Sequence, residues 1–176
     1  MKRKWLKLGM LSVVLALISR NSLAAWGTRA EDDVFTDSKK MVMVGQAKNA
    51  GFLVFECIQG KISASYVESA DVSQIQEGML ADLFIKVDDF PGIRLSALSV
   101  VRNRKAYAIR AEDPADSVKN ILRDLRAGKH RFLLGFETED NRRLSTSGSL
   151  DGSTEAVNKF IKACDIELPA TMPKKD

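Results

Sequence analysis

The sequence predicts an α+β fold, with a mainly antiparallel, sandwich-like β-sheet core and two amphipathic helices. Three observations support this class. Apolar and polar residues alternate in several short runs, turn residues separate these runs at hairpin spacing, and only two segments repeat with a helical period. The chain has no β-α-β alternation and no internal repeat, which argues against a parallel sheet and against a repeat array. We therefore predict a single domain over residues 25–168, followed by a flexible tail over 169–176.

The strand prediction is clearest at 82–88, where the side chains of Leu83, Ile85 and Val87 are expected to face inward and those between them outward. Gln59-Gly60 and 139–141 are typical of hairpin turns. Residues 26–40 are polar, and we expect no regular structure there. The further strands are predicted at 41–47, 51–58, 61–67, 93–101, 105–110, 130–138 and 142–150.

Two segments have the period of an amphipathic helix. In the first, over 115–127, apolar residues recur at intervals of three and four, and Gly128 is a typical C-terminal stop. Its opposite face carries a basic stripe formed by Lys119, Arg123 and Arg126. The second helix is predicted over 153–164, with an apolar face that includes Cys164.

The first 24 residues have the three regions of a secretory signal. Basic residues precede an apolar run over 8–18, which is too short to span a bilayer, and small residues follow at Ser22 and Ala24. We expect cleavage after Ala24 and export, with the periplasm as the expected compartment and release to the medium as the alternative. Arg20 lies close to the cleavage site and keeps an uncleaved signal anchor open as another interpretation. If the signal is cleaved, no transmembrane segment is expected.

Cleavage of the signal would change the net charge of the mature protein. The full chain has 27 basic and 23 acidic residues, and five of the basic ones lie within 1–24, which leaves 22 against 23. A nucleic-acid partner is therefore not expected. Residues 102–143 remain rich in basic side chains, so an anionic envelope component or an acidic protein is a possible partner.

Cys57 and Cys164 are the only cysteines. Both are predicted to face the core, and an exported protein folds where disulfides form, so a structural bridge between them is expected. The alternative is a catalytic or redox thiol. The chain contains no C-x-x-C motif, and its one histidine, His130, follows Gly128-Lys129 at the predicted start of a strand.

Enzyme chemistry has little support in the sequence. A single histidine with two cysteines cannot form a usual zinc site, and neither a nucleophile motif nor a phosphate-binding glycine loop is present. We expect no catalytic residue, no metal and no cofactor. The candidate anion contacts are the basic stripe together with Arg142 and Arg143, whose alternative role is to solubilise exposed faces. Trp26 is a candidate either for a partner contact or for packing on the domain.

The order of several short motifs resembles that of small periplasmic accessory proteins associated with type VI secretion, and more loosely that of invasion-associated exported proteins. The resemblance covers about 26–165 and uses Trp26, Thr36-Asp37, Lys86-Val87-Asp88 and Ser147-Gly148-Ser149, together with the two cysteines. It implies a non-enzymatic envelope protein with one disulfide, and it transfers no catalytic residue.

The sequence thus predicts an exported, non-enzymatic envelope protein that binds a protein or an envelope component. An accessory factor of a secretion system would be one protein of this kind. One alternative is an inhibitor of a cell-wall hydrolase, which would insert the loop 88–92 or 139–141 into the enzyme. Another is a hydrolase that uses a pair of carboxylates, whose positions the sequence does not identify.

Overall fold

The computed structural model describes residues 25–32, 39–112 and 115–170. The predicted signal over 1–24 and the motif Thr36-Asp37 lie outside these residues, as does most of the predicted tail. Within the described residues, no helix is long and apolar enough to cross a membrane.

The fold is α+β with an antiparallel sheet, as predicted. A single nine-stranded sheet has the order β1-β2-β3-β4-β7-β6-β5-β8-β9, and all its pairings are antiparallel. The strands are β1 (Trp26–Asp32), β2 (Lys39–Gln46), β3 (Phe52–Ile58), β4 (Lys61–Ser69), β5 (Leu80–Val87), β6 (Ile93–Asn103), β7 (Ala106–Ala111), β8 (Arg131–Thr138) and β9 (Arg143–Ser149). A short 3-10 turn, η1 (Val72–Gln74), lies between β4 and β5.

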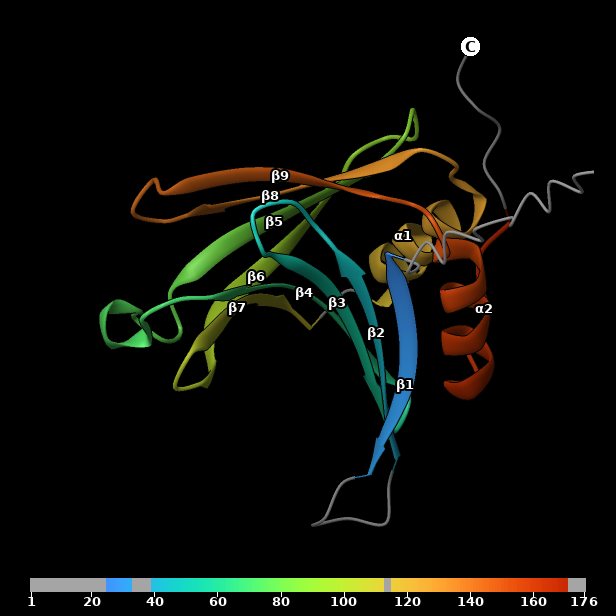
Figure 1. Ribbon diagram of the computed structural model, residues 1–176, viewed down its shortest axis with the longest axis horizontal. Helices are drawn as coiled ribbons and strands as arrows, with labels where there is room; N and C mark the ends of the chain where they lie inside the picture. The colour runs from blue at the N-terminus through green and yellow to red at the C-terminus, as the bar shows by residue number, and fades with distance from the viewer. Residues whose placement is uncertain (1–24, 33–38, 113–114, 171–176) are drawn as a thin grey trace, which may run out of the picture.

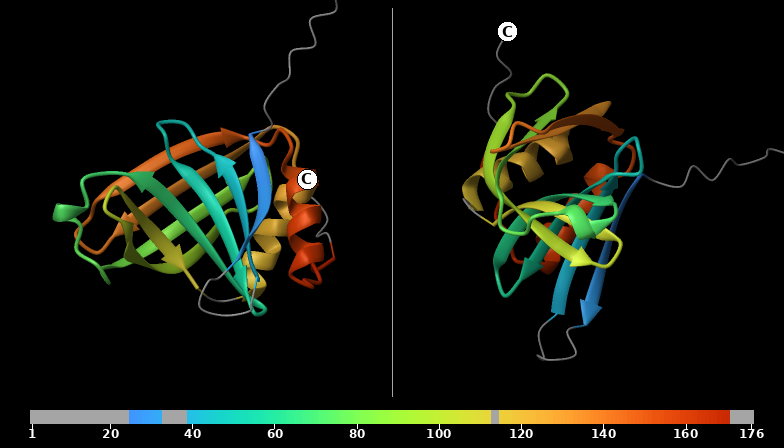
Figure 2. Two further views of the ribbon diagram at one scale, coloured as in Figure 1. Left: turned by 60° about the horizontal axis from the view of Figure 1, so that its bottom comes forward. Right: turned by 90° about the vertical axis from the view of Figure 1, so that its left-hand side faces the viewer.

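The sheet curls so that its two halves face each other around the core (Figures 1 and 2). Tyr66 on β4 contacts Phe136 on β8 with ring centroids 5.4 Å apart. The edge strands β1 and β9 are connected where the Trp26 indole N–H donates to the carbonyl of Ser149 at 2.7 Å. The Lys48 N–H, in the loop between β2 and β3, donates to the carbonyl of Ser147 on β9 at 2.8 Å. These contacts hold the two edges of the curled sheet near each other.

Both helices lie at one end of the curled sheet (Figure 1). Helix α1 (Ala115–Ala127) packs against β4, β5 and β6, and α2 (Ser153–Ala163) packs against β1, β2 and α1. Their apolar residues recur at the predicted intervals. These residues are buried because the apolar faces of both helices pack against the sheet and against each other. They are Val118, Ile121, Leu122 and Leu125 from α1 and Ala156, Val157 and Phe160 from α2.

Most predicted strands are confirmed to within a few residues. Leu83, Ile85 and Val87 are buried, as their alternation predicted. Gln59 and Gly60 both have positive φ, 50° and 79°, as a two-residue hairpin turn of the primed type requires. The expectation of irregular structure over 26–40 is wrong for 26–32, which form β1. This strand pairs with β2 along its whole length, and tertiary pairing outweighs its polar composition.

Asp88 holds the start of β8 against the end of β5. Its backbone is left-handed, with φ of 41°, and its carboxylate accepts the N–H groups of Lys129 at 2.7 Å, Arg131 at 2.9 Å and His130 at 3.3 Å. Partial burial acts to raise the pKa of Asp88, but these donors outweigh it and hold the pKa below its ordinary value of 3.8.

We predict that Asp88→Ala destabilises the fold by about 2 kcal/mol at neutral pH, because hydrogen bonds to a charged acceptor are lost. The stabilisation from a depressed carboxyl pKa is complete above the unfolded-state value and is lost as the pH falls through the folded-state value. Urea unfolding at neutral pH and below pH 3.8 measures both effects. Asp88→Asn is the control, since it tolerates left-handed backbone and keeps an acceptor oxygen. Equal stability of wild type and Asp88→Ala at neutral pH would contradict this role.

Candidate functional site

The predicted basic stripe on α1 is not a continuous solvated surface, because Arg123 is only 4% exposed. Its guanidinium forms an ion pair with Asp124 at 2.8 Å and donates to Asn120 at 2.7 Å and to the carbonyl of Ala170 at 3.4 Å. Burial raises the pKa of Asp124, more than Arg123 lowers it. Arg123 thus connects α1 to the C-terminal segment and is not free to bind a ligand. Lys119 and Arg126 are partly exposed.

Trp26 has the packing role that the sequence left open. Its side chain is 5% exposed, and its ring meets that of Phe132 edge-on with centroids 5.4 Å apart. The ring also lies against Gly45, where a Cβ atom would be only 2.5 Å from the indole. Trp26 therefore packs inside the domain and presents no aromatic surface to a partner.

Arg142 and Arg143 lie at the other end of the molecule from the helices, at the turn between β8 and β9 (Figure 1). They form part of the rim of a cavity of about 280 Å³, which opens between this turn and the segment before β5. The other lining residues are Ile75, Gln76, Met79, Ser99, Tyr107, Ile109, Phe136, Thr138 and Leu144. Apolar side chains dominate this lining, and the two arginines supply charge at its mouth.

Two hydroxyls in the cavity wall, those of Ser99 and Tyr107, are already hydrogen-bonded within the protein. The Ser99 hydroxyl accepts from the N–H of Met79 at 2.9 Å and donates to the carbonyl of Gln76. The Tyr107 hydroxyl donates to Glu68 at 3.3 Å. Burial and the Glu68 carboxylate raise the pKa of Tyr107 to about 12, so this phenol stays neutral at physiological pH.

Each rim arginine is held by one carboxylate. Arg142 Nε lies 2.7 Å from Asp140, and Arg143 Nη2 lies 2.6 Å from Glu137. A guanidinium has five N–H donors, so each side chain keeps donors for a further acceptor. The cavity therefore combines an apolar interior with two arginine side chains at its entrance that keep N–H groups for a further acceptor.

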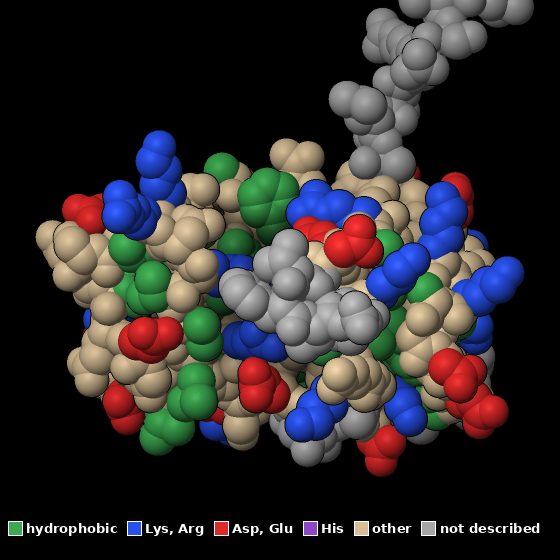
Figure 3. Space-filling model, turned by 90° about the horizontal axis from the view of Figure 1, so that it is seen from below, with side chains coloured by type: hydrophobic (Ala, Val, Ile, Leu, Met, Phe, Trp, Pro, Cys, Tyr) green, Lys and Arg blue, Asp and Glu red, His purple; other side chains and the backbone are tan. Residues whose placement is uncertain are grey.

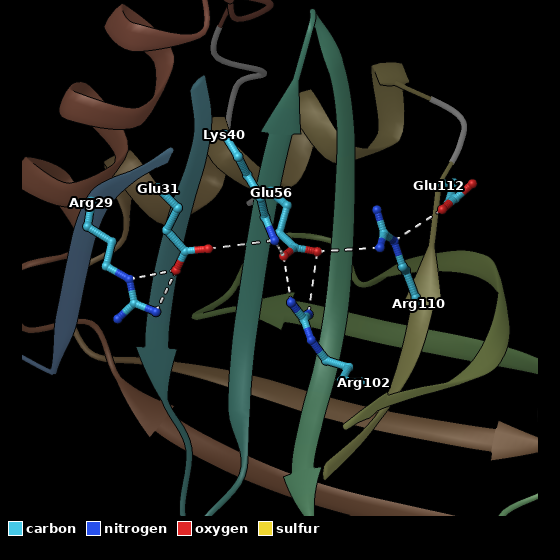
Figure 4. A network of polar contacts seen from close by, with 7 residues as sticks. All are labelled: Arg29, Glu31, Lys40, Glu56, Arg102, Arg110 and Glu112. Atoms are coloured by element: carbon cyan, nitrogen blue, oxygen red, sulfur yellow. Dashed lines mark hydrogen bonds and ion pairs between the residues drawn. The ribbon is translucent and has the colours of Figure 1, made fainter. Parts of the chain in front are cut away.

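A second charged cluster lies on the outer face of the sheet around Glu56 (Figure 4). This carboxylate is 2% exposed and forms ion pairs with Lys40, with Arg102 at 2.6 Å and with Arg110 at 3.5 Å. Burial acts to raise the pKa of Glu56, but Arg102 and Lys40 outweigh it and lower the pKa. The cluster connects strands β2, β3, β6 and β7. Its role is therefore structural. The sequence signal for it was a lone acid inside the apolar run 52–58.

Figure 3 shows basic and acidic side chains interspersed over the face seen from below. The uneven charge along the sequence does not become a surface of one sign on this face. The candidate anion contacts are divided between α1 and the β8–β9 turn.

Cys57 on β3 and Cys164 at the end of α2 are neighbours, as the sequence predicted, and both are thiols in this structure. Burial and a hydrogen bond with Cys57 raise the pKa of Cys164 well above its ordinary value. Among the residues that the structure describes, no group of three His, Cys, Asp or Glu side chains is placed to hold a metal ion.

Comparison with protein-family models, with curated proteins and with solved structures finds no match to this chain.

Proposed function

We propose that the protein is an exported, non-enzymatic binding protein of the cell envelope, and that it holds an amphipathic anion in the cavity beneath Arg142 and Arg143. The observation that carries this proposal is the combination of an apolar interior of about 280 Å³ with two arginines at its mouth. The signal-like segment over 1–24 supports export. The motif order over 26–165 supports an envelope accessory role, including one associated with secretion.

The ligand class follows from the cavity's chemistry. Met79, Ile109, Phe136 and other apolar side chains favour a hydrocarbon or aromatic body, since burial of apolar surface drives such binding. A carboxylate or phosphate at the mouth would accept the remaining guanidinium N–H groups. The volume lies near the lower end for small-molecule sites, which favours a short acyl chain over a complete membrane lipid.

Calorimetric titration of the purified protein with decanoate tests the proposal. We expect saturable binding, and we expect the double substitution Arg142→Gln, Arg143→Gln to weaken it at least tenfold, which corresponds to about 1.4 kcal/mol. Decanol should bind more weakly than decanoate to the wild type, because it has the same chain without the charge.

The matched control is Lys119→Gln, Arg126→Gln, which removes the same charge from α1 at the other end of the molecule. Its affinity for decanoate should equal that of the wild type. Equal weakening by the two double substitutions would indicate a long-range effect of net charge, and absence of saturable binding would contradict the proposed cavity.

A further inference from the structure

Strand β9 is one edge of the sheet (Figure 1), and the direction of its backbone groups follows from its pairing with β8. The Thr138 N–H donates to the carbonyl of Arg142 at 3.0 Å, and the Leu150 N–H donates to the carbonyl of His130 at 3.2 Å. Hydrogen bonding alternates along an antiparallel pair, so the even-numbered residues of β9 bond to β8. The odd-numbered residues direct their N–H and C=O groups away from β8.

One end of this edge is already occupied, because the carbonyl of Ser147 accepts from the N–H of Lys48 at 2.8 Å. The other end is open. Within the part of the chain that the structure describes, nothing pairs with the outward N–H and C=O groups of Arg143 and Ser145, and both residues are exposed. Residues 143–145 therefore form an open edge, with two donors and two acceptors at the spacing of a β-strand.

The open edge adjoins a groove of about 780 Å³ on the outer face of the sheet. Ser145 is in register with Gly135 on β8, and Gly135 is in register with Phe84 on β5. These two small residues form the floor of the groove between the edge and Phe84, which is 39% exposed. Leu133, 37% exposed, adds apolar surface along β8. A side chain opposite Ser145 on a strand added beside β9 would face this floor.

The charges near the open edge are mostly positive. Lys86, Arg94 and Arg143 line the groove against one carboxylate, that of Glu137. Arg94 and Arg143 each pair with one acid, whereas Lys86 has no ion pair among the described residues. Lys48, exposed beside the occupied end of the edge, has none among them either. Acidic side chains on a bound segment would complement this charge.

From these observations we infer that the open edge binds an acidic, extended peptide segment of a partner protein, which adds to the sheet beside β9. In antiparallel pairing, the residues opposite Arg143 and Ser145 each exchange two hydrogen bonds with the edge. The residue opposite Ser145 is apolar and faces the groove. An acid two positions later lies opposite Arg143, and an acid two positions earlier lies beside Lys48.

Other occupants fit the open edge less well. A second copy of this chain would present its own β9, which carries Arg143 and no acid, so two such edges would bring cations together. An anionic lipid or polysaccharide supplies negative charge but does not supply N–H and C=O groups that alternate at the spacing of a strand. The open backbone groups thus favour a peptide, and the charge favours an acidic one.

The test is calorimetric titration of the full protein with the synthetic peptide acetyl-TDTFTDT-amide. Antiparallel pairing places its phenylalanine opposite Ser145 and its aspartates beside Arg143 and Lys48. We expect saturable binding at millimolar or lower concentration. The peptide acetyl-TKTFTKT-amide should bind at least tenfold more weakly, and acetyl-TDTATDT-amide should also bind more weakly because it lacks the aromatic ring.

Ser145→Pro tests the backbone pairing, because it removes the outward N–H of residue 145 but no hydrogen bond to β8. It should weaken peptide binding at least tenfold. Ser145→Ala is the matched control, since it keeps the N–H, and its affinity should equal that of the wild type. Urea unfolding checks that Ser145→Pro is folded. Lys48→Glu tests the charge independently and should weaken binding at least threefold, whereas Lys119→Glu on α1 should not.

The inference is overturned if acetyl-TDTFTDT-amide shows no saturable binding, if the lysine peptide binds as tightly, or if folded Ser145→Pro or Lys48→Glu binds as the wild type does. A wild-type dimer that Ser145→Pro dissociates, without peptide binding, would assign the edge to a second copy instead. Arg143 also lines the proposed decanoate cavity and is left unchanged for this reason. Ser145 does not line that cavity, so decanoate affinity should be unchanged in Ser145→Pro, which separates the two sites.

Discussion

Trp26→Ala is expected to destabilise the protein by about 3–5 kcal/mol, which is the usual cost of truncating a large buried aromatic side chain. The indole fills space between Gly45 and Phe132, and its N–H donates to the carbonyl of Ser149 at 2.7 Å. Its removal would leave a cavity and an unsatisfied carbonyl where the two edges of the curled sheet meet. Urea unfolding of the wild type and the variant measures the difference.

Trp26→Phe separates packing from hydrogen bonding. It keeps an aromatic ring but cannot donate to Ser149, so we expect a loss smaller than that of Trp26→Ala. Decanoate affinity of folded Trp26→Phe should match that of the wild type, because Trp26 does not line the cavity. Unchanged stability of Trp26→Ala, or a specific loss of decanoate binding in Trp26→Phe, would contradict the packing role.

Oxidation of Cys57 and Cys164 to a disulfide is expected to stabilise the protein by about 4–5 kcal/mol. The bridge would close a loop of roughly a hundred residues, and the loss of unfolded-state entropy grows with loop length. It would also tie α2 to β3 in the core. The neighbouring positions of the two thiols support this pairing. Thiol titration and mass spectrometry of protein folded in an oxidising compartment should detect no free thiol and a mass lower by two hydrogens.

Urea unfolding with and without reductant measures the stabilisation. The double substitution Cys57→Ser, Cys164→Ser is the control, and its stability should not respond to reductant. Two free thiols in protein folded in an oxidising compartment would rule out the disulfide. An oxidised protein whose stability is unchanged by reduction would contradict the expected contribution.

The fold class was predictable from sequence because, in most elements, the residues that the apolar spacing places on an inner face are the ones that are buried. Alternation over 82–88 placed Leu83, Ile85 and Val87 in the core, and the period of three and four identified both helices. Strand β1 was missed because its seven residues include charged side chains, and its strand structure depends on pairing with β2. Local pattern carries no information about such a partner.

The candidate site was predictable only in part. Arg142 and Arg143 were identified as exposed basic residues next to a turn, but the cavity between distant segments such as Ile75 and Phe136 follows from the curl of the sheet. Arg123 looked like a solvated helix position, and its burial depends on Asp124 and the C-terminal segment around Ala170.

The most direct test of the proposed binding function is a titration of isotopically labelled protein with decanoate, followed by amide and methyl chemical shifts. We predict saturable shifts at cavity residues such as Ile75, Met79, Ile109 and Leu144, and none at α2. Shifts confined to the helices, or none at millimolar decanoate, would contradict the assignment of the cavity as the binding site.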